Sequence, residues 1–288
     1  MLTRFTALAL PLCVGLLTLA PPALSQALIP HVPQLDEAQL EEQGLILAQE
    51  AAQLSQFQQF EIALIRAQLA SQLLPQNPQV WGLLGSIHLQ LNQQEEAIEA
   101  LLQARSLEPD NTAVLFALGT AYFRTENYQR SVQFLQEGVR LRDDEPAAFF
   151  DLGNAYYMLN RSEEAIAAYQ RAIEIDESFW PAVNNIGLVH YEAGNIDEAV
   201  ESWEAALAID ESQPEPKLAI AVALFTQGQQ DDAIRQGETA LREDIRYADP
   251  EFLRENLWGD RLITQAELFL QLPRIRDTLA GLSQPSDL

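Results

Sequence analysis

Three histidines and two clusters of acidic residues are the side chains of this chain that could act in catalysis or hold a metal. His31, His88 and His190 are too far apart in sequence to form a local metal-binding motif. The clusters Asp143-Asp144-Glu145 and Asp231-Asp232 lack the alternating ligands and the turn glycine of a calcium loop. We interpret the acidic clusters as solvated loops, and His88 and His190 as packing residues between paired helices.

Other catalytic signatures are absent from the sequence. It contains no nucleophile elbow, no glycine-rich phosphate loop and no Cys/His cluster. The single cysteine, Cys13, lies in an apolar N-terminal run, so we expect no thiol chemistry. The sequence therefore predicts a protein that is not an enzyme and that binds no cofactor, no metal and no small-molecule substrate. A metal-assisted periplasmic accessory enzyme that uses the acidic clusters is an alternative interpretation.

Residues 1–25 have the pattern of an export signal. Arg4 supplies positive charge, residues 5–19 are apolar, and Pro21-Pro22 precedes small residues suited to cleavage. The apolar run is shorter than the roughly 20 residues that a membrane-spanning helix needs. We therefore expect a signal peptide at 1–25, export across a bacterial inner membrane to the periplasm or thylakoid lumen, and a soluble mature chain. Retention of this segment as a membrane anchor is left open.

The chain is strongly acidic. Seventeen Lys and Arg residues face 42 Asp and Glu residues, which gives a formal net charge of −25 over 288 residues. Such a surface repels nucleic acids and anionic lipid head groups. We therefore exclude nucleic acid as a partner, expect membrane contact only through a partner or an uncleaved signal, and expect a protein or peptide ligand, with a basic one favoured.

The elements that must position any binding residues repeat along the chain. Gly85, Gly119, Gly153 and Gly187 follow one another at a spacing of 34, with Ala221 at the next position. A period of this length, with two apolar stripes of helical spacing in each block, is typical of stacked helix–turn–helix units. The sequence predicts an all-α solenoid of six antiparallel helix pairs in blocks 44–77, 78–111, 112–145, 146–179, 180–213 and 214–247.

The flanks of the repeats have their own composition. Residues 26–43 read as a linker and the acidic start of a helix, with Asp36-Glu37 and Glu41-Glu42 in it. Residues 248–288 lack the repeat and read as capping helices and a tail, with a break at Pro273. We expect these flanks to cover the ends of the solenoid.

Residues 44–247 resemble the tetratricopeptide repeat (TPR) family. The segment from Pro146 to Tyr157, followed by Ala165 and Ala172, matches the family signature at nearly every defining position. The resemblance implies a right-handed superhelical solenoid in which the first helix of each pair lines a concave face, the usual ligand surface. The closing segment, 248–288, also resembles that of exported TPR proteins of cyanobacteria and the thylakoid lumen.

The resemblance places a row of aromatic residues and several polar residues on the concave face. Aromatic rings give large contact area at a small cost in entropy, so they suit an extended or helical peptide. An alternative is that these rings only cover the seams between repeats. The residues that we expect to form a peptide-binding groove are Phe116, Phe123, Arg124, Phe150, Asn154, Tyr157, Asn184, Asn185, Tyr191 and Phe225.

One known groove function can be tested by residue type. TPR co-chaperones hold an acidic peptide carboxylate with cationic residues and two asparagines, and Asn154 and Asn185 match the asparagine positions. The cationic positions hold Phe150, Glu215 and Ala219, so binding of acidic tails is disfavoured. We interpret the chain as an exported, non-catalytic scaffold that binds a protein or peptide in its groove, for example in assembly or maintenance of a photosynthetic or envelope complex. The alternative is a structural bridging protein that uses its acidic convex surface.

Overall fold

The computed structural model describes residues 36–282. The expected signal peptide at 1–25, most of the expected linker and the last six residues lie outside the described residues. Contacts separate a unit Met1–Asp36 from a unit Glu37–Leu288, and the fold described below is that of the second unit. Across residues 36–282, the regular elements are all helices, and none is long and apolar enough to cross a membrane.

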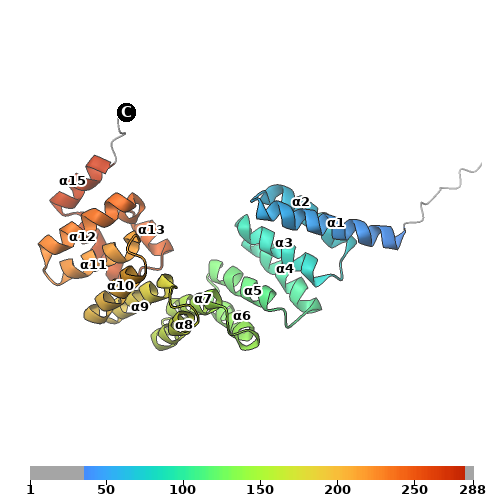
Figure 1. Ribbon diagram of the computed structural model, residues 1–288, viewed down its shortest axis with the longest axis horizontal. Coiled ribbons are helices and arrows are strands. Elements are labelled where there is room, and N and C mark those ends of the chain that lie inside the picture. The colour runs from blue at the N-terminus through green and yellow to red at the C-terminus, as the bar shows by residue number, and fades with distance from the viewer. Residues whose placement is uncertain (1–35, 283–288) are drawn as a thin grey trace, which may run out of the picture. The chain divides into compact units, whose positions relative to one another are not determined.

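Twelve helices form six consecutive antiparallel pairs (Figure 1). Each helix packs against its pair partner, and the second helix of each of the first five pairs also packs against the first helix of the next pair. The pairs are α1 (Glu37–Gln56) with α2 (Phe60–Leu73), α3 (Pro78–Gln90) with α4 (Gln94–Leu107), α5 (Thr112–Arg124) with α6 (Tyr128–Leu141), α7 (Pro146–Met158) with α8 (Ser162–Ile175), α9 (Trp180–Ala193) with α10 (Ile196–Ile209), and α11 (Pro214–Thr226) with α12 (Gln230–Glu243).

The 34-residue period sets the helix boundaries. From α3 to α11, the first helices begin at residues 78, 112, 146, 180 and 214, and every second helix begins 34 residues after the previous one. Proline at the first turn of α3, α7 and α11 fits a helix start because its missing N–H has no partner there. The Asn77 side chain caps α3 by accepting hydrogen bonds from the backbone N–H groups of Gln79 and Val80 at 3.0 and 3.2 Å.

The turn inside each pair has one residue with positive φ, again at a spacing of 34. The residues are Gln58, Asn92, Glu126, Asn160, Gly194 and Gly228, with φ between 54° and 90°. Glycine and asparagine tolerate this left-handed conformation, whereas glutamine and glutamate are strained in it. The repeated turn therefore keeps its geometry even where the residue type is unfavourable.

The repeated glycine makes room for a large side chain of the second helix. A Cβ atom added at Gly153 would lie 2.5 Å from Cε1 of Tyr169, and at Gly187 it would collide with the Trp203 ring. Tyr169 and Trp203 are fully buried. The glycine therefore lets an aromatic ring of one helix lie directly on the backbone of its partner.

A closing segment packs against the last two pairs. It consists of a 3₁₀ turn, η1 (Ile245–Ala248), and three helices, α13 (Pro250–Glu255), α14 (Asp260–Leu270) and α15 (Pro273–Leu282). Helix α15 packs on α12, while α14 packs on α9 and α11, the first helices of the fifth and sixth pairs. Phe269 of α14 is fully buried, with its ring against Gly237 and 5.8 Å from the ring of Phe225.

Candidate protein-binding groove

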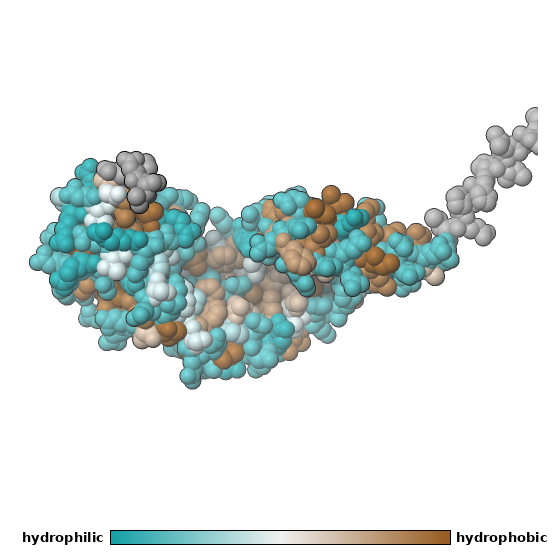
Figure 2. Space-filling view, turned by 45° about the horizontal axis from the view of Figure 1, so that its top comes forward, coloured by the Kyte–Doolittle hydropathy of each residue, from teal (hydrophilic) through white to brown (hydrophobic). Residues whose placement is uncertain are grey.

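The first helices form a continuous row, because neighbouring first helices contact each other from α1 to α9. We call the inner face the side of this row that carries Leu83, Ser86 and Leu89 of α3 and their equivalents at intervals of 34 residues. Figure 2 shows that the surface is hollowed over the middle repeats and that hydrophobic residues gather in the hollow. This is where the expected groove would lie.

Burial increases towards the C-terminal end in two of the three rows of the inner face. In the Ser86 row, Ser86 is exposed, Thr120 is half-buried, Asn154 is 9% exposed, Leu188 1% and Val222 0%. The Leu83 row changes in the same way: Leu83, Ala117 and Asp151 are half-buried, whereas Asn185 is 7% and Ala219 0% exposed. In the Leu89 row, Leu89 is 7% exposed, Phe123, Tyr157 and Phe225 are half-buried, and Tyr191 is 0% exposed. Apart from Leu89 and Asn154, the inner face is therefore accessible over α3, α5 and α7, and apart from Phe225 it is buried over α9 and α11.

Helix α14 is the element that closes it. The carboxylate of Glu192, at the C-terminal end of α9, accepts hydrogen bonds from the backbone N–H groups of Leu262 at 2.9 Å and Arg261 at 3.2 Å. N–H groups in the first turn of a helix have no partner within the helix, so Glu192 supplies one to each of these two. Its negative charge also interacts favourably with the helix dipole of α14. The Arg261 guanidinium lies 5.7 Å from the centre of the Tyr191 ring. Glu192 thus attaches the start of α14 to the fifth repeat.

A buried polar network connects the fourth, fifth and sixth repeats. The amide oxygen of Asn154 accepts hydrogen bonds from the Tyr169 hydroxyl at 2.8 Å and from the Asn185 side chain at 2.9 Å. The Asn184 side chain in turn donates to Asn185 at 3.1 Å and to the Glu215 carboxylate at 3.1 Å. These side chains come from α7, α8, α9 and α11, so the network links three consecutive repeats.

Glu215 ends the network as a buried carboxyl group. It is 6% exposed and accepts hydrogen bonds from Asn184 and from the indole N–H of Trp258, which lies in the loop before α14, at 3.1 Å. Burial raises the pKa of Glu215 to about 7, although hydrogen bonds from Asn184, Trp258 and Tyr247 oppose the rise. The Trp258 contact joins two residues 43 positions apart and attaches the closing segment to α11.

The structure therefore differs from the expected open ladder at four residues. Asn154, Asn184, Asn185 and Tyr191 are all 9% exposed or less. Tyr191 bonds through its hydroxyl to Thr226 at 3.0 Å, and its ring packs 5.9 Å from that of Trp203. The asparagines are used in the internal network. The asparagines are buried among their network partners on α7, α8, α9 and α11, and Tyr191 lies beneath Arg261 of α14. These four side chains therefore offer little contact area to a ligand.

Three of the expected aromatic residues are half-buried in the seams between helices. The Phe116 ring lies against Gly138 and under the Arg142 guanidinium, 5.2 Å from its centre. Phe150 packs 5.8 Å from Tyr169 and 5.5 Å from Phe179. The third is Phe225, which meets Phe269 of α14. Their main contacts are with the protein itself, as the alternative interpretation of the aromatic row predicts.

The remaining expected residues lie where the inner face is open. Phe123 is half-buried with its ring 5.3 Å from Tyr128, and Arg124 is exposed, with one guanidinium N–H donated to the Leu89 carbonyl at 2.8 Å. Tyr157 is half-buried, and its hydroxyl is among the buried polar atoms without a hydrogen-bond partner. Asp151 adds a carboxylate that accepts a 2.9 Å hydrogen bond from Thr120. These side chains can recognise a chain segment, but they do not form a nucleophile–base arrangement.

An acidic hollow lies at the boundary between the open and the closed part. It has a volume of about 520 Å³, and its lining includes Tyr157, Glu192, Arg254, Trp258 and Asp260. Burial raises the pKa of Tyr157, and the negative charges of Glu192 and Asp260 raise it further. A neutral tyrosine hydroxyl next to two carboxylates suits a basic or hydrogen-bond-donating group of a ligand.

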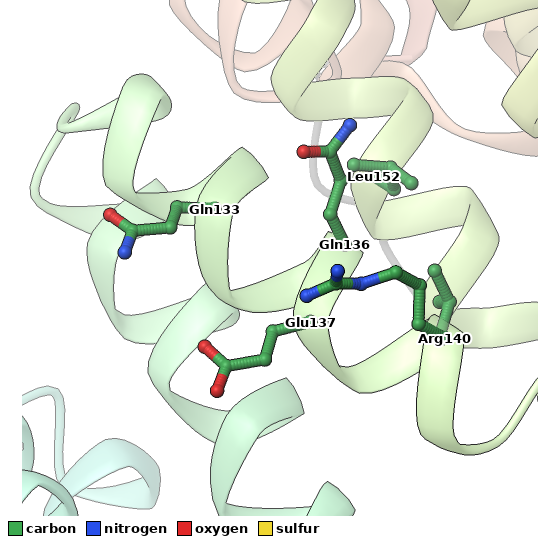
Figure 3. A pocket seen from close by; sticks show the side chains of 6 residues that line it. Gln133, Gln136, Glu137, Arg140 and Leu152 are labelled. Atoms are coloured by element: carbon green, nitrogen blue, oxygen red, sulfur yellow. The ribbon is translucent and has the colours of Figure 1, made fainter.

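A second hollow, of about 490 Å³, lies beside α6 and is less suited to binding (Figure 3). Of its labelled polar side chains, Gln133 and Gln136 extend away from each other and from Glu137 and Arg140, so the four do not converge on one point. Glu137 is already paired with Arg105 of α4 at 3.0 Å. The lining of this hollow comes from α6 and from Leu152 of α7.

The histidines and acidic clusters singled out in the sequence do not come together. His88 is 7% exposed and its Nδ1 lies 2.7 Å from the Gln93 side-chain oxygen, a packing role. Among residues 36–282 there is no group of three His, Cys, Asp or Glu side chains placed to hold a metal ion. His31 lies outside the described residues.

Comparisons with known proteins agree with this architecture. Residues 26–176 match the family model described as the TPR domain of cytochrome c-type biogenesis protein H, and residues 187–228 match a model of the TPR repeat. The first match alone covers more than half of the chain. Among curated proteins, no sequence matches this chain.

Several solved structures are similar. The MamA protein is 26% identical with a TM-score of 0.55, over 59% of this chain and 93% of that one. YrrB, described as a TPR protein with an unusual peptide-binding site, is 21% identical with a TM-score of 0.55, over 62% and 92%. Pseudomonas aeruginosa PilF is 16% identical with a TM-score of 0.61, over 75% and 99%. The chain therefore belongs to the tetratricopeptide repeat family, whose fold is a scaffold for protein–protein interaction.

Proposed function

We propose that this protein is an exported, non-catalytic scaffold that binds a peptide segment of a partner protein on the open part of its inner face, over α3, α5 and α7. The observation that carries the proposal is the change in burial along that face. Apart from Leu89 and Asn154, equivalent positions are accessible in the second to fourth repeats, whereas all but Phe225 are buried in the fifth and sixth, where α14 packs on α9 and α11. The accessible inner face over α3, α5 and α7, which we call the strip, is then the surface available to a ligand, and it ends where α14 packs on α9.

The chemistry of the strip favours a basic or neutral peptide. Arg124 is its cation, and one of its N–H groups is already donated to the Leu89 carbonyl. Asp151 lies on the strip, and Glu192 and Asp260 line the acidic hollow at its end. A lysine or arginine of the ligand could pair with these carboxylates while its neighbours contact the rings of Phe123 and Tyr157.

Selection of peptides from a random library with the chain lacking residues 1–25 tests this function. We expect the selected peptides to be enriched in Lys and Arg. Phe123→Ala and Tyr157→Ala should each weaken their binding about tenfold, as loss of an aromatic contact does. Leu102→Ala is the matched control, because Leu102 is 38% exposed on α4, away from the inner face. Equal binding by all three variants would show that the ligand does not use this strip.

The site of action is a further part of the proposal. The first family match begins at residue 26, where the expected signal peptide ends, and that family model is named for a protein of cytochrome c biogenesis. Both support export and a role in assembly or maintenance of an envelope or photosynthetic complex. Mass spectrometry of the chain recovered from an envelope fraction tests export. We expect a mass that lacks about 25 N-terminal residues. A full-length chain confined to the cytoplasm would contradict export.

A further inference from the structure

The outer face of α2 carries a row of exposed apolar side chains. Ile62, Ile65 and Leu69 are 49%, 57% and 42% exposed. Their spacing of three and four residues places them on one side of the helix. We call these three residues the α2 stripe. The face that α2 buries in the first repeat is a different one, formed by Ala63, Ala67 and Ala70, which are all 0% exposed.

The other five repeats provide an internal comparison. At the positions equivalent to the α2 stripe, none of their residues is a large apolar one, and most are charged or amides. The equivalent residues are Glu96, Glu99 and Gln103 in α4; Arg130, Gln133 and Glu137 in α6; Glu164, Ala167 and Arg171 in α8; Glu198, Glu201 and Ala205 in α10; and Asp232, Arg235 and Thr239 in α12. Figure 3 shows two of them, Gln133 and Glu137, extending outward from α6.

The position of the first repeat at the end of the solenoid does not explain the α2 stripe. It does explain Ile46 of α1, which is 41% exposed, because its equivalents Val80 and Val114 are buried by a preceding repeat that α1 lacks. The stripe positions, in contrast, are exposed or half-buried in every repeat. Apolar residues there are therefore specific to α2. Figure 2 also shows hydrophobic residues gathered on the first repeats.

The surroundings of the α2 stripe are acidic. Eight acidic residues of α1, α2 and α4 are exposed, and we call them the acidic rim: Glu37, Glu41, Glu42, Glu50, Glu61, Glu95, Glu96 and Glu99. The two arginines of the same region are already paired, Arg66 with Glu50 at 3.3 Å and Arg105 with Glu137 at 3.0 Å. A second copy of this chain would bring the same acidic rim, and the two rims would repel each other. A basic partner would be attracted instead.

We propose that the α2 stripe is a docking site for a basic amphipathic helix of a partner protein, separate from the inner face. Apolar residues of that helix at intervals of three and four residues pack on Ile62, Ile65 and Leu69. Lysine and arginine residues on its flanks face the acidic rim. With the groove, this gives the scaffold two binding surfaces, so it can hold two partners at once.

A synthetic helix tests the docking site directly. The probe is an 18-residue helical peptide of leucine and lysine, with leucine on one face, labelled for fluorescence anisotropy. The first control peptide has glutamate in place of lysine, and the second has the same composition in an order without an apolar face. We expect the full chain to bind the first peptide and not the two controls.

Two matched variants separate apolar docking from charge attraction. Ile65→Glu and Gln133→Glu add the same charge at equivalent positions of α2 and α6. Charge alone predicts that both variants bind the basic helix more tightly. Docking predicts that Ile65→Glu weakens binding about tenfold or more, because an apolar contact is lost, while Gln133→Glu does not weaken it. Circular dichroism checks that both variants are folded.

Further measurements distinguish a basic helix at the α2 stripe from a second copy of the chain or a membrane at the same place. They also separate this docking site from peptide binding on the inner face. Tyr157→Ala should leave binding of the basic helix unchanged, so the α2 site can fail or succeed independently of the groove. A dimer of the chain that Ile65→Glu dissociates in sedimentation would make a second copy the occupant and overturn the proposal. Binding to phosphatidylcholine vesicles that Ile65→Glu abolishes would make a membrane the occupant, with the same consequence. Equal weakening by Ile65→Glu and Gln133→Glu would also overturn it.

Discussion

The buried carboxyl group of Glu215 makes attachment of the closing segment dependent on pH. Its pKa is raised from 4.5 to about 7 by burial. Below the pKa of Glu215 in the unfolded chain, the carboxyl group is protonated in both the folded and the unfolded state, so the free energy of unfolding does not depend on its titration. Between the two pKa values the unfolded chain loses the proton while the folded protein keeps it, so stability falls as pH rises. Above about pH 7 the loss is complete.

The size of this effect follows from the shift in pKa. The rise from 4.5 to about 7, at 1.36 kcal/mol per pKa unit, corresponds to about 3 kcal/mol of lost stability. Local unfolding of a segment such as α14 can require no more free energy than this. Glu215→Gln keeps an oxygen that accepts from Asn184 and Trp258, and it cannot ionise. We therefore expect Glu215→Gln to be more stable than the wild type by up to about 3 kcal/mol at pH 8 and nearly equal at pH 4.

Hydrogen exchange of α14 measures this difference locally. A local readout is needed because a repeat array does not unfold as one cooperative unit. After correction for the intrinsic exchange rate, amides of α14 in the wild type should open about 100-fold more often at pH 8 than at pH 4. In Glu215→Gln this pH dependence should disappear. An equal pH dependence in both proteins, or a Glu215→Gln protein that is less protected at pH 8, would refute the reasoning.

Three further predictions concern single contacts. Glu192→Ala removes both hydrogen bonds to the start of α14, so exchange in α14 should increase by the equivalent of about 1–2 kcal/mol; unchanged protection would contradict this attachment. Glu126→Gly relieves a φ of 58° and should raise stability by about 0.5–1 kcal/mol in a urea titration, whereas Asn160→Gly should do less because asparagine tolerates this conformation. Gly153→Ala places a Cβ 2.5 Å from the Tyr169 ring and should lower the melting temperature, at a cost of about 1–3 kcal/mol; a neutral effect would show that the ring can move.

The repeat architecture could be predicted because each helix pair repeats the same local rules. The glycine spacing, the turn residues and the prolines all recur every 34 residues, and the helix starts follow them. Each rule concerns neighbours within about 30 residues, so a single sequence contains enough information to apply it.

The cover over the last two repeats could not be predicted in this way. Residues 248–282 have no repeat partner from which to infer their position, and the decisive contacts, such as Trp258 with Glu215 and Leu262 with Glu192, join distant parts of the chain. The burial of Asn184 and Tyr191 follows from those contacts. Gly259 precedes the first residue of α14, but its residue type does not indicate the surface on which that helix packs.

The α2 stripe, in contrast, was open to prediction. Placing Ile62, Ile65 and Leu69 beside Glu96, Glu99 and Gln103 already reveals the apolar substitution. The structure adds that these three side chains are exposed. If they were buried, their apolar character would be explained by packing in the hydrophobic core. Comparison of equivalent positions in a repeat protein therefore identifies candidate binding surfaces, because it shows where one repeat departs from the residue types of the others.

The central claim is that a partner peptide binds the inner face over α3, α5 and α7 and ends where α14 closes it. Hydrogen-exchange footprinting of the chain with a saturating library-selected peptide tests this most directly. We predict added protection in α3, α5 and α7, and no change in α9 and α11, which are already covered. Added protection confined to the second helices, or displacement of α14 with new protection in α9 and α11, would contradict it.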